Sequence, residues 1–565
     1  MHAPRKWWAW VLSLGVLLFL GAFLIYPVSF TLRRAFGLEG EWTLRHFGTL
    51  LESPLQREAL ANSLILAFAT TIATTLISLP IAHWMTRYRF AGKGWLNGLL
   101  LVPMIMPPFV GAIGLKQLLG KFGSLNLGLV KLGLLAPDHP IDWLGHGGFV
   151  GMVVLQSLSL YPIMFLNLSA SLANVDPSLR EAAQNLGATP WRLFRTITLP
   201  LILPGYFAGA TIVFIWAFTD LGTPLMLGYA RVVPVQIFDA LSELNTNPSG
   251  YALVVTVLML CGGLFLLSKH FVGSRRYDSL ARGQVTGAES QAGWRQTGFI
   301  WICAGGLILI SLLPHVMVVV QALADRWFFT VLPQSYTSAN FSEVLGHGLT
   351  ASSIKNSLLY SGLSSLADLI LGVIIAWLIT RACLPISPLI DMLATLPLAL
   401  PGLVLAFGYV AGFDSKYGWL NPRVNPTLLL IVSYTVRRLP FIVRSAVAGF
   451  QQTSVTLEEA SGNLGASPFR TLRKITLPLV AANLIAGTLL TFSFAMLEVS
   501  DGLILAMREQ FFPMTKMIWQ LIGRMEPNAP SVACALGVLG MILLMISLLV
   551  AGRILGKRMG QLFKA

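Results

Sequence analysis

Charged residues are scarce in this chain of 565 residues. Asp, Glu, Lys and Arg together make up 11% of it and apolar residues 55%, whereas soluble domains contain about 25% charged residues. So few charges cannot cover a surface that faces water. The mean hydropathy of +0.72 therefore predicts a membrane protein whose apolar runs cross a bilayer.

Cysteine is also rare, and the motifs of common enzymes are missing. The four cysteines form no CxxC pair, so we expect small core residues and neither a zinc site nor a disulfide framework. No HExxH or GxSxG motif occurs and the eight histidines form no ligand pair, so we predict no catalytic residue and no metal site. The phosphate-binding GxxxxGK[ST] motif is missing too, which assigns any ATP hydrolysis to another chain.

The net charge of +15 has an ordinary explanation in a membrane protein. Lys and Arg collect in cytoplasmic connections, so the basic balance does not indicate a nucleic-acid partner. Taken over alternate connections, Lys and Arg are more frequent on the side of the N-terminus, where Arg87, Arg180 and Arg381 lie. This bias predicts a multi-pass protein with both termini in the cytoplasm.

Twelve apolar stretches are each long enough to cross a bilayer, which takes about 20 residues. They lie near residues 7–32, 59–84, 95–114, 148–172, 203–227, 250–273, 297–324, 356–380, 386–411, 425–450, 479–505 and 531–552. Sheet edges cannot be satisfied in lipid, and no alternating pattern of about ten residues recurs, so the spans should be helices. The predicted fold class is an all-α membrane protein with about twelve transmembrane helices.

The second half of the chain repeats the first. Pro107 recurs as Pro401, 294 residues further on, and the run 181–200 recurs as 459–478 with 13 of 20 positions identical. The second displacement is 278, so the first half should carry about 16 extra residues (294 − 278), which we place in an outer loop at 115–147. The repeat begins on the same side each time, so it is parallel.

Two homologous domains of six spans each follow from the repeat. They are residues 1–273 and 297–565, joined by a cytoplasmic linker, 274–296, which is rich in Gly, Ser, Gln and Arg.

A short helix, a turn and a second short helix are predicted before the fifth span of the first half, on the cytoplasmic face. Asp176 can cap the first helix with Pro177 at its first position, and Gly187 supplies a left-handed stop. Glu181 alone is also explained as a capping residue, because Ser178-x-x-Glu181 has the spacing of a capping box.

The second half carries the same pattern. Thr456 and Glu459 are expected to form a T-x-x-E capping box, and Gly465 is the expected stop.

The spacing in both copies resembles the EAA-x3-G-x9-I-x-LP signature of the permeases of ABC importers. The residues are Glu181-Ala182-Ala183, Gly187 and Ile197-x-Leu199-Pro200 in the first copy, and Glu459-Ala460-Ser461, Gly465 and Ile475-x-Leu477-Pro478 in the second. The resemblance covers essentially the whole chain as two fused type I permease domains. It implies that each short helix docks in a groove of a cytoplasmic ATPase subunit and transmits its closure to the membrane helices. Small residues suit this contact because they let backbones approach closely.

The resemblance also implies partners and a location. The chain would be a transport subunit of the bacterial inner membrane and not an enzyme, with no cofactor of its own. ATP and Mg would bind to two cytoplasmic ABC ATPase subunits, and solute would arrive on a periplasmic substrate-binding protein.

Within that family, three runs look closest to the fused permeases of ferric-iron importers: residues 220–224, 401–408 and 434–440. Ferric iron is therefore the predicted solute, held tightly by the binding protein and only loosely along the path. Permeases for phosphonate, sugar phosphate, thiamine or polyamine look similar and stay as alternatives. A secondary transporter with a carboxylate relay is a further alternative, but it does not explain two EAA-like segments.

Charged residues inside the predicted spans are costly unless they are paired or wet. They are Asp220, Asp368, Asp391, Glu498, Asp501, Arg437 and Arg438. Asp220 and Glu498 are related by the 278 displacement, so we expect both on the fifth helix of their half, toward the outside. They would line a translocation path or an outer gate between the halves, or else anchor neighbouring helices through hydrogen bonds.

Arg437 and Arg438 correspond to the neutral Ser159 and Leu160 of the first half. This asymmetry suggests that the arginines are counter-ions that pair with Glu498 or Asp501 and close the path. Snorkelling to a membrane interface is the alternative.

Overall fold

The computed structural model describes residues 7–37, 42–243, 248–273, 289–414 and 418–555. Both chain ends and most of the predicted linker 274–296 lie outside these residues, so the cytoplasmic position of the termini stays a prediction. The last residues of the linker are described. There, β2 (Ser290–Gln291) pairs in parallel with β1 (Tyr88–Arg89).

Helices make up most of the described structure, which confirms the predicted all-α membrane class. Nine of the described helices are long and apolar enough to cross a membrane, or up to eleven if each of two bent pairs counts as one span. The nine are Trp7–Phe36, Pro54–Arg87, His146–Ala173, Pro190–Thr219, Ser249–Ser268, Trp294–Ala322, Gly348–Ala382, Pro468–Met496 and Ala529–Ser547. The remaining predicted span, 425–450, is the helix α20 (Thr427–Gln452), which is less apolar because it carries Arg437 and Arg438.

The third span of each half, predicted as one apolar run, is bent. In the first half α5 (Lys93–Ile105) is followed by α6 (Pro108–Leu119), and the stretches Lys93–Met104 and Pro108–Lys131 meet at 88°. In the second, α18 (Ser387–Thr395) with η6 (Leu396–Leu398) meets α19 (Gly402–Phe413) at 103°. Prolines 107 and 401 stand at the two bends, where a residue without an N–H and with a fixed φ ends a helix.

The described helices fall into two compact units, each of which takes its first span from the other half of the sequence. One unit contains residues 53–236 and 259–340, and the other contains 1–52, 237–258 and 341–565. The predicted domains 1–273 and 297–565 follow the sequence repeat, whereas the units follow contacts in space.

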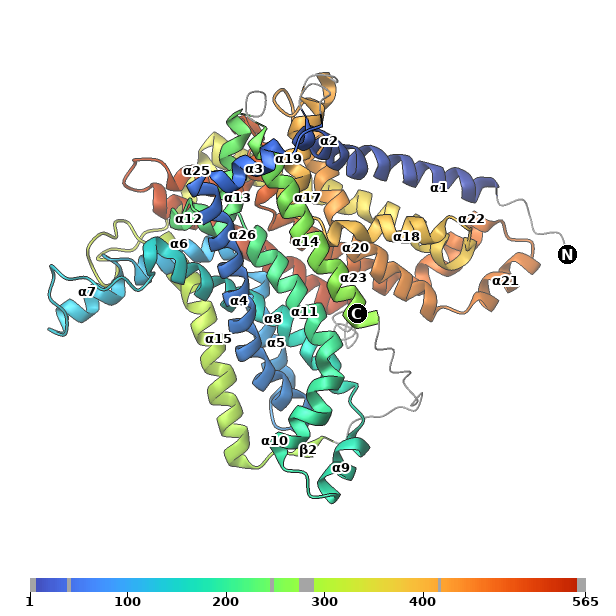
Figure 1. The fold of residues 1–565 in the computed structure, drawn as a ribbon, viewed down its shortest axis with the longest axis horizontal. Helices are drawn as coiled ribbons and strands as arrows, with labels where there is room; N and C mark the ends of the chain where they lie inside the picture. The colour runs from blue at the N-terminus through green and yellow to red at the C-terminus, as the bar shows by residue number, and fades with distance from the viewer. Residues whose placement is uncertain (1–6, 38–41, 244–247, 274–288, 415–417, 556–565) are drawn as a thin grey trace. The chain divides into compact units, whose positions relative to one another are not determined.

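The unit built mainly from the first half has α4, α8 and α11 at its core, packed against one another, with α15 along α6 (Figure 1). Its elements besides α5, α6, β1 and β2 are α4 (Pro54–Arg87), α7 (Ser124–Lys131), η2 (His146–Gly148), α8 (Phe149–Ala173), α9 (Pro177–Asn185), α10 (Pro190–Leu193), η3 (Phe194–Thr198), α11 (Leu199–Thr219), α12 (Gly222–Leu227) and α15 (Trp294–Ala322).

The other unit repeats this plan, with α17, α20 and α23 at its core and α2 along α19. Its further elements are α1 (Trp7–Leu20), η1 (Gly21–Ile25), α2 (Tyr26–Phe36), α3 (Arg45–Glu52), η4 (Ala240–Glu243), α17 (Gly348–Trp377), η5 (Leu378–Ala382), η7 (Gly418–Leu420), α21 (Val455–Asn463), α22 (Pro468–Thr471), η8 (Leu472–Thr476), α23 (Leu477–Met496), α24 (Ser500–Leu505), η9 (Glu509–Phe511), α25 (Met514–Ile522) and α26 (Ala529–Leu555). Three helices have residues in both units: α13 (Val233–Asp239), α14 (Ser249–Gly273) and α16 (Ala339–Gly346).

The predicted core position of the cysteines holds for two of the four. Cys261 and Cys534 are buried, Cys303 is half-buried and Cys383 is exposed.

A glycine in each unit lets the borrowed first span lie directly on the broken helix. A Cβ on Gly408 of α19 would lie 2.8 Å from the carbonyl oxygen of Pro27 in α2. A Cβ on Gly114 of α6 would overlap the carbonyl oxygen of Pro314 in α15. Gly114 and Gly408 are 294 residues apart, so the repeat preserves this close approach.

Replacing Gly408 by Ala should therefore push α2 away from α19. We expect Gly408→Ala to lower the free energy of unfolding by about 1–3 kcal/mol, the usual cost of overpacking. The matched control is Gly362→Ala on α17, where nothing lies within 4 Å of the new Cβ and the better helix propensity of Ala should leave stability equal or higher. Thermal unfolding in detergent compares the two, and equal melting temperatures would contradict this packing.

Candidate functional site

The segment before the fifth span of the first half has the predicted turn and caps. The Asp176 carboxylate accepts the N–H of Ser178 at 2.8 Å, with Pro177 at the first position of α9. Gly187 ends the segment with φ +77°, a conformation that costs a residue with a Cβ about 1–2 kcal/mol. The cap and the stop of the first copy are thus confirmed.

The second copy has the predicted stop but a different cap. Gly465 has φ +81°, whereas α21 begins at Val455 and its N-cap is Ser454, whose hydroxyl accepts the N–H of Thr456 at 3.3 Å. The predicted capping box of Thr456 and Glu459 is therefore wrong. The hydroxyl of Ser454 stands two residues earlier and accepts the N–H of Thr456, which the Glu459 carboxylate would have accepted in the predicted box.

The two glutamates of the signature lie beyond the capping positions. With Asp176 and Ser454 as N-caps, the third helical positions are Leu179 and Leu457, and Glu181 and Glu459 follow two residues later. Both glutamates are exposed. The interpretation of the glutamates as capping residues is therefore wrong, and their side chains are free to meet a partner.

An exposed apolar surface accompanies each pair of short helices. The exposed fractions are 47% for Leu179, 89% for Leu186 and 70% for Trp191, and the residues 278 positions further on match them, with 47% for Leu457, 90% for Leu464 and 72% for Phe469. We call these two surfaces the coupling surfaces. Large apolar side chains that a repeat keeps exposed at matching positions mark a surface for binding another protein.

The small residues of the signature divide between the two sides of their helices. Ala182 and Ala460 are exposed, and Ala183 is half-buried. Ser461 is buried, and its hydroxyl lies 2.9 Å from that of Thr471. Ala182 and Ala460 are thus placed where a partner backbone can approach, while Ser461 holds α21 against α22.

We call the pairs of short helices, α9 with α10 and α21 with α22, the two coupling segments. Sequence reasoning missed an ion pair that anchors the second of them. The Arg381 guanidinium, at the end of the second span, lies 3.0 Å from the Glu458 carboxylate of α21 and donates to the carbonyl oxygens of Phe450 and Thr453. Glu458 also accepts the hydroxyl of Thr476 at 3.2 Å. The two displacements of the repeat could have revealed this ion pair. Arg381 corresponds to Arg87, 294 residues earlier, and Glu458 corresponds to Arg180, 278 residues earlier.

The two intramembrane arginines pair with the carboxylates that were predicted as their partners. Arg437 lies 2.5 Å from Glu498 and 3.3 Å from Asp501, and Arg438 donates a charged hydrogen bond to Glu498. Ser433 donates a hydroxyl hydrogen bond of 2.9 Å to Asp501. Both carboxylates are buried, and the guanidinium groups turn toward them, so the snorkelling alternative is wrong. We call these five residues the charge cluster.

The other intramembrane acids have separate surroundings. Asp391 pairs with Arg444 at 2.9 Å. Asp368 of α17 is fully buried and neither of its carboxylate oxygens has a hydrogen-bond partner.

Asp220 lies in the other compact unit, among neutral partners. It accepts the side-chain amide of Gln156 at 3.1 Å and the backbone N–H groups of Gly222 and Thr223. Thr70 of α4 donates to the same Gln156. Asp220 thus joins three helices through hydrogen bonds, and none of the described basic residues pairs with it.

The fifth helix of each half ends before the carboxylate that was predicted to lie on it. α11 ends at Thr219 and α23 at Met496, so Asp220 and Glu498 stand in breaks that lead to α12 and α24. The predicted continuous spans 203–227 and 479–505 are wrong in this respect. The reason is local, because both side chains accept backbone N–H groups of the next short helix and so compete with helix continuation.

A short helix outside the spans supports the second break. The hydroxyl of Thr515 in α25 donates to the carbonyl oxygen of Glu498 at 2.8 Å. The next residue, Lys516, donates to the carbonyl oxygen of Leu503 in α24 at 2.7 Å, and burial lowers the pKa of its ammonium group to about 8. Sequence reasoning missed both residues.

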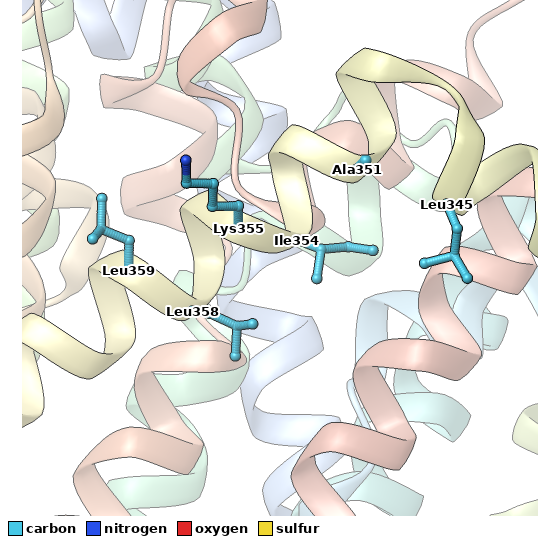
Figure 2. Close-up of a pocket in the computed structure, with 6 residues that line it drawn as sticks. All are labelled: Leu345, Ala351, Ile354, Lys355, Leu358 and Leu359. Carbon is cyan, nitrogen blue, oxygen red and sulfur yellow. The ribbon is translucent and has the colours of Figure 1, made fainter.

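An apolar groove of about 530 Å³ lies between α16 and the first turns of α17. Its lining residues are Leu345, Ala351, Ile354, Lys355, Leu358 and Leu359 (Figure 2). It includes none of the predicted site residues, and its lining is apolar apart from Lys355.

Some known proteins are similar to most of this chain, and others are similar to a part of it about the size of one half. A ferric transport system permease protein of Actinobacillus pleuropneumoniae is 27% identical over 510 residues, which are 88% of this chain and 71% of that protein. An Fe(3+)-transport system permease protein of Haemophilus influenzae is 25% identical over 89% of this chain and 90% of its own length. The molybdenum transport system permease protein of Haemophilus influenzae is 28% identical, and 98% of it matches 40% of this chain.

One family matches the chain twice, at residues 75–277 and 368–561, once in each half. These two stretches cover most of the chain and include both coupling segments and the charge cluster. The chain belongs to the family of inner membrane components of binding-protein-dependent transport systems.

Proposed function

We propose that this chain is the permease subunit of an ATP-driven importer that moves ferric iron from a periplasmic binding protein into the cytoplasm. The observation that carries the proposal is the pair of coupling surfaces, one before each fifth span, in a chain of this family. The transport reaction needs an energy source, and the two surfaces provide places for two copies of a cytoplasmic ATPase that binds ATP and Mg.

Ferric iron is the solute best supported by the relatives. Two relatives that match most of this chain carry iron in their names, whereas the molybdenum permease matches two-fifths of it. Among the described residues no three His, Cys, Asp or Glu side chains come together to hold a metal ion. Tight recognition of the ion therefore belongs to the binding protein, and the permease need only pass it on.

The charge cluster is proposed as a gate element of the transport path. Its four charged side chains meet at a break in the fifth helix. A change in the direction of the helix at this break would separate the arginines of α20 from Glu498 and Asp501. Its counterpart around Asp220 has hydrogen bonds, and within the described part of the chain no ion pair reaches it. The two breaks would therefore open at different energetic cost.

The importer hypothesis is tested by reconstituting uptake. Proteoliposomes containing the chain, the ATPase and ATP, supplied with binding protein loaded with radioactive ferric iron, should accumulate iron, and the chain alone should not. Uptake by the chain alone under an imposed pH gradient would overturn the hypothesis in favour of an ion-coupled carrier. Uptake of molybdate but not iron in the full system would keep the importer and change the solute.

Placing a carboxylate on a coupling surface should disconnect the ATPase. Leu186→Asp and Leu464→Asp change side chains that are about nine-tenths exposed, so folding should be unaffected. We expect at least tenfold weaker binding of the ATPase, because apolar anchors at the centre of an interface contribute about 2 kcal/mol or more. Co-purification and ATP-driven uptake measure the effect. Met525→Asp, at a fully exposed methionine outside both coupling surfaces, is the control, and equal loss in all three variants would contradict the assignment.

Neutralising the two break carboxylates should have unequal effects on stability. Glu498→Gln leaves two buried guanidinium groups without their main partner, so we expect unfolding to become easier by about 3–5 kcal/mol. Asp220→Asn should cost about 1 kcal/mol, since Asp220 faces an amide and backbone N–H groups. Thermal unfolding in detergent compares them, and similar losses would rule out a special contribution of the arginines. Solute-stimulated ATP hydrolysis by the stable Asp220→Asn complex then tests the role of this break in transport.

A further inference from the structure

The cytoplasmic end of the second span has opposite charge patterns in the two halves. In the second half Glu458 of α21 neutralises Arg381. In the first half the residue in place of Glu458 is Arg180 of α9, so two arginines, Arg87 and Arg180, stand where the second half has an ion pair.

The first-half arginines are close enough to repel each other, and no carboxylate of the described residues forms an ion pair with either of them. Burial and the charge of Arg87 both lower the pKa of Arg180, against weaker opposite effects of Tyr88 and Glu181. The Nε atom of Arg87 is buried without a hydrogen-bond partner, and the guanidinium rests on the ring of Tyr88. His83, one turn earlier on α4, lies within electrostatic reach of both arginines. Among the described residues no ion pair is formed by Arg87 or Arg180, and the neighbouring Glu181 is exposed.

Two half-buried cations held together cost free energy that an anion would recover. We propose that Arg87 and Arg180 form a phosphate-binding site that takes the headgroup phosphate of an anionic phospholipid or a free phosphate ion. The bound group would occupy the position that the Glu458 carboxylate fills in the second half. Guanidinium groups suit this ligand, because their planar pairs of N–H donors match phosphate oxygens.

The position of the site favours phosphate over an acidic side chain of the ATPase. Arg180 and Glu458 share a place in the repeat, and Glu458 faces the transmembrane helices, where it contacts Arg381 and Thr476. The coupling surface, with Leu179 and Leu186, is the exposed side of the same helix. Arg87 ends a 34-residue span, which places it at the level of the lipid headgroups, where anionic lipids attract clustered cations.

Supplying the missing carboxylate from within the chain tests the site. The full-length protein is placed in nanodiscs of phosphatidylcholine, of phosphatidylcholine with phosphatidylglycerol, or of phosphatidylcholine with added inorganic phosphate. We expect phosphatidylglycerol, phosphate or both to raise the melting temperature of the unaltered protein. Arg180→Glu should raise the melting temperature in phosphatidylcholine alone and abolish the response to either anion. Whichever anion acts in the unaltered protein identifies the source of the phosphate.

The control matches the change in charge without touching the site. Arg192→Glu alters an exposed arginine of α10 and should keep the full anion response. If Arg180→Glu does not fold, Arg180→Gln is measured instead. It should need an anion concentration about ten times higher for the same rise in melting temperature, because one charged hydrogen-bonding partner is lost. An equal anion response in the unaltered protein and Arg180→Gln would overturn the proposal. Stabilisation by the ATPase but by neither anion would overturn it too, in favour of an acidic protein group.

Discussion

A helix broken inside a bilayer must be covered by protein, because lipid offers no hydrogen bonds to the backbone groups that the break sets free. Prolines 107 and 401 impose such a break on the third span of each half. The first span of the other sequence half lies along each broken helix, close enough that Gly114 and Gly408 have no room for a side chain. Neither half of the sequence therefore makes up a compact unit alone, which gives a physical reason for carrying both in one chain.

The halves share a backbone plan but differ in charge at two corresponding places. At the break after the fifth helix, Arg437 and Arg438 replace Ser159 and Leu160, so Glu498 has counter-ions whereas Asp220 has an amide and backbone donors. At the coupling segment Glu458 replaces Arg180, so the second half has an internal ion pair and the first has a surplus of cations. In both places the second half satisfies its charges from within.

Periodicity, repeats and motif spacing were enough to predict the helical class, the two homologous halves, the pair of short helices before each fifth span and the partners of Arg437 and Arg438. Breaks in helices were harder to predict, because hydropathy shows how long an apolar run is and not whether the helix through it is continuous. Asp220 and Glu498 stop their helices through hydrogen bonds to the next few N–H groups, a competition that composition does not reveal. The cap at Ser454 was missed for a related reason, since Ser454 and Thr456 are both good caps and tertiary context decides between them. Arg381 with Glu458 could have been found by applying both displacements together.

The second half connects its coupling segment to its charge cluster through one continuous stretch of helix. Thr476, which donates to Glu458, stands directly before α23, and Glu458 in turn contacts Arg381 at the end of the second span. At its other end α23 stops at Met496, two residues before the carboxylate that holds Arg437 and Arg438. Packed helices move as rigid elements because their interiors are close-packed. A displacement of α21 by a bound partner would therefore reach the end of α23 beside Glu498, whereas in the first half Arg180 stands in place of Glu458 and no ion pair of the described residues links α9 to the second span.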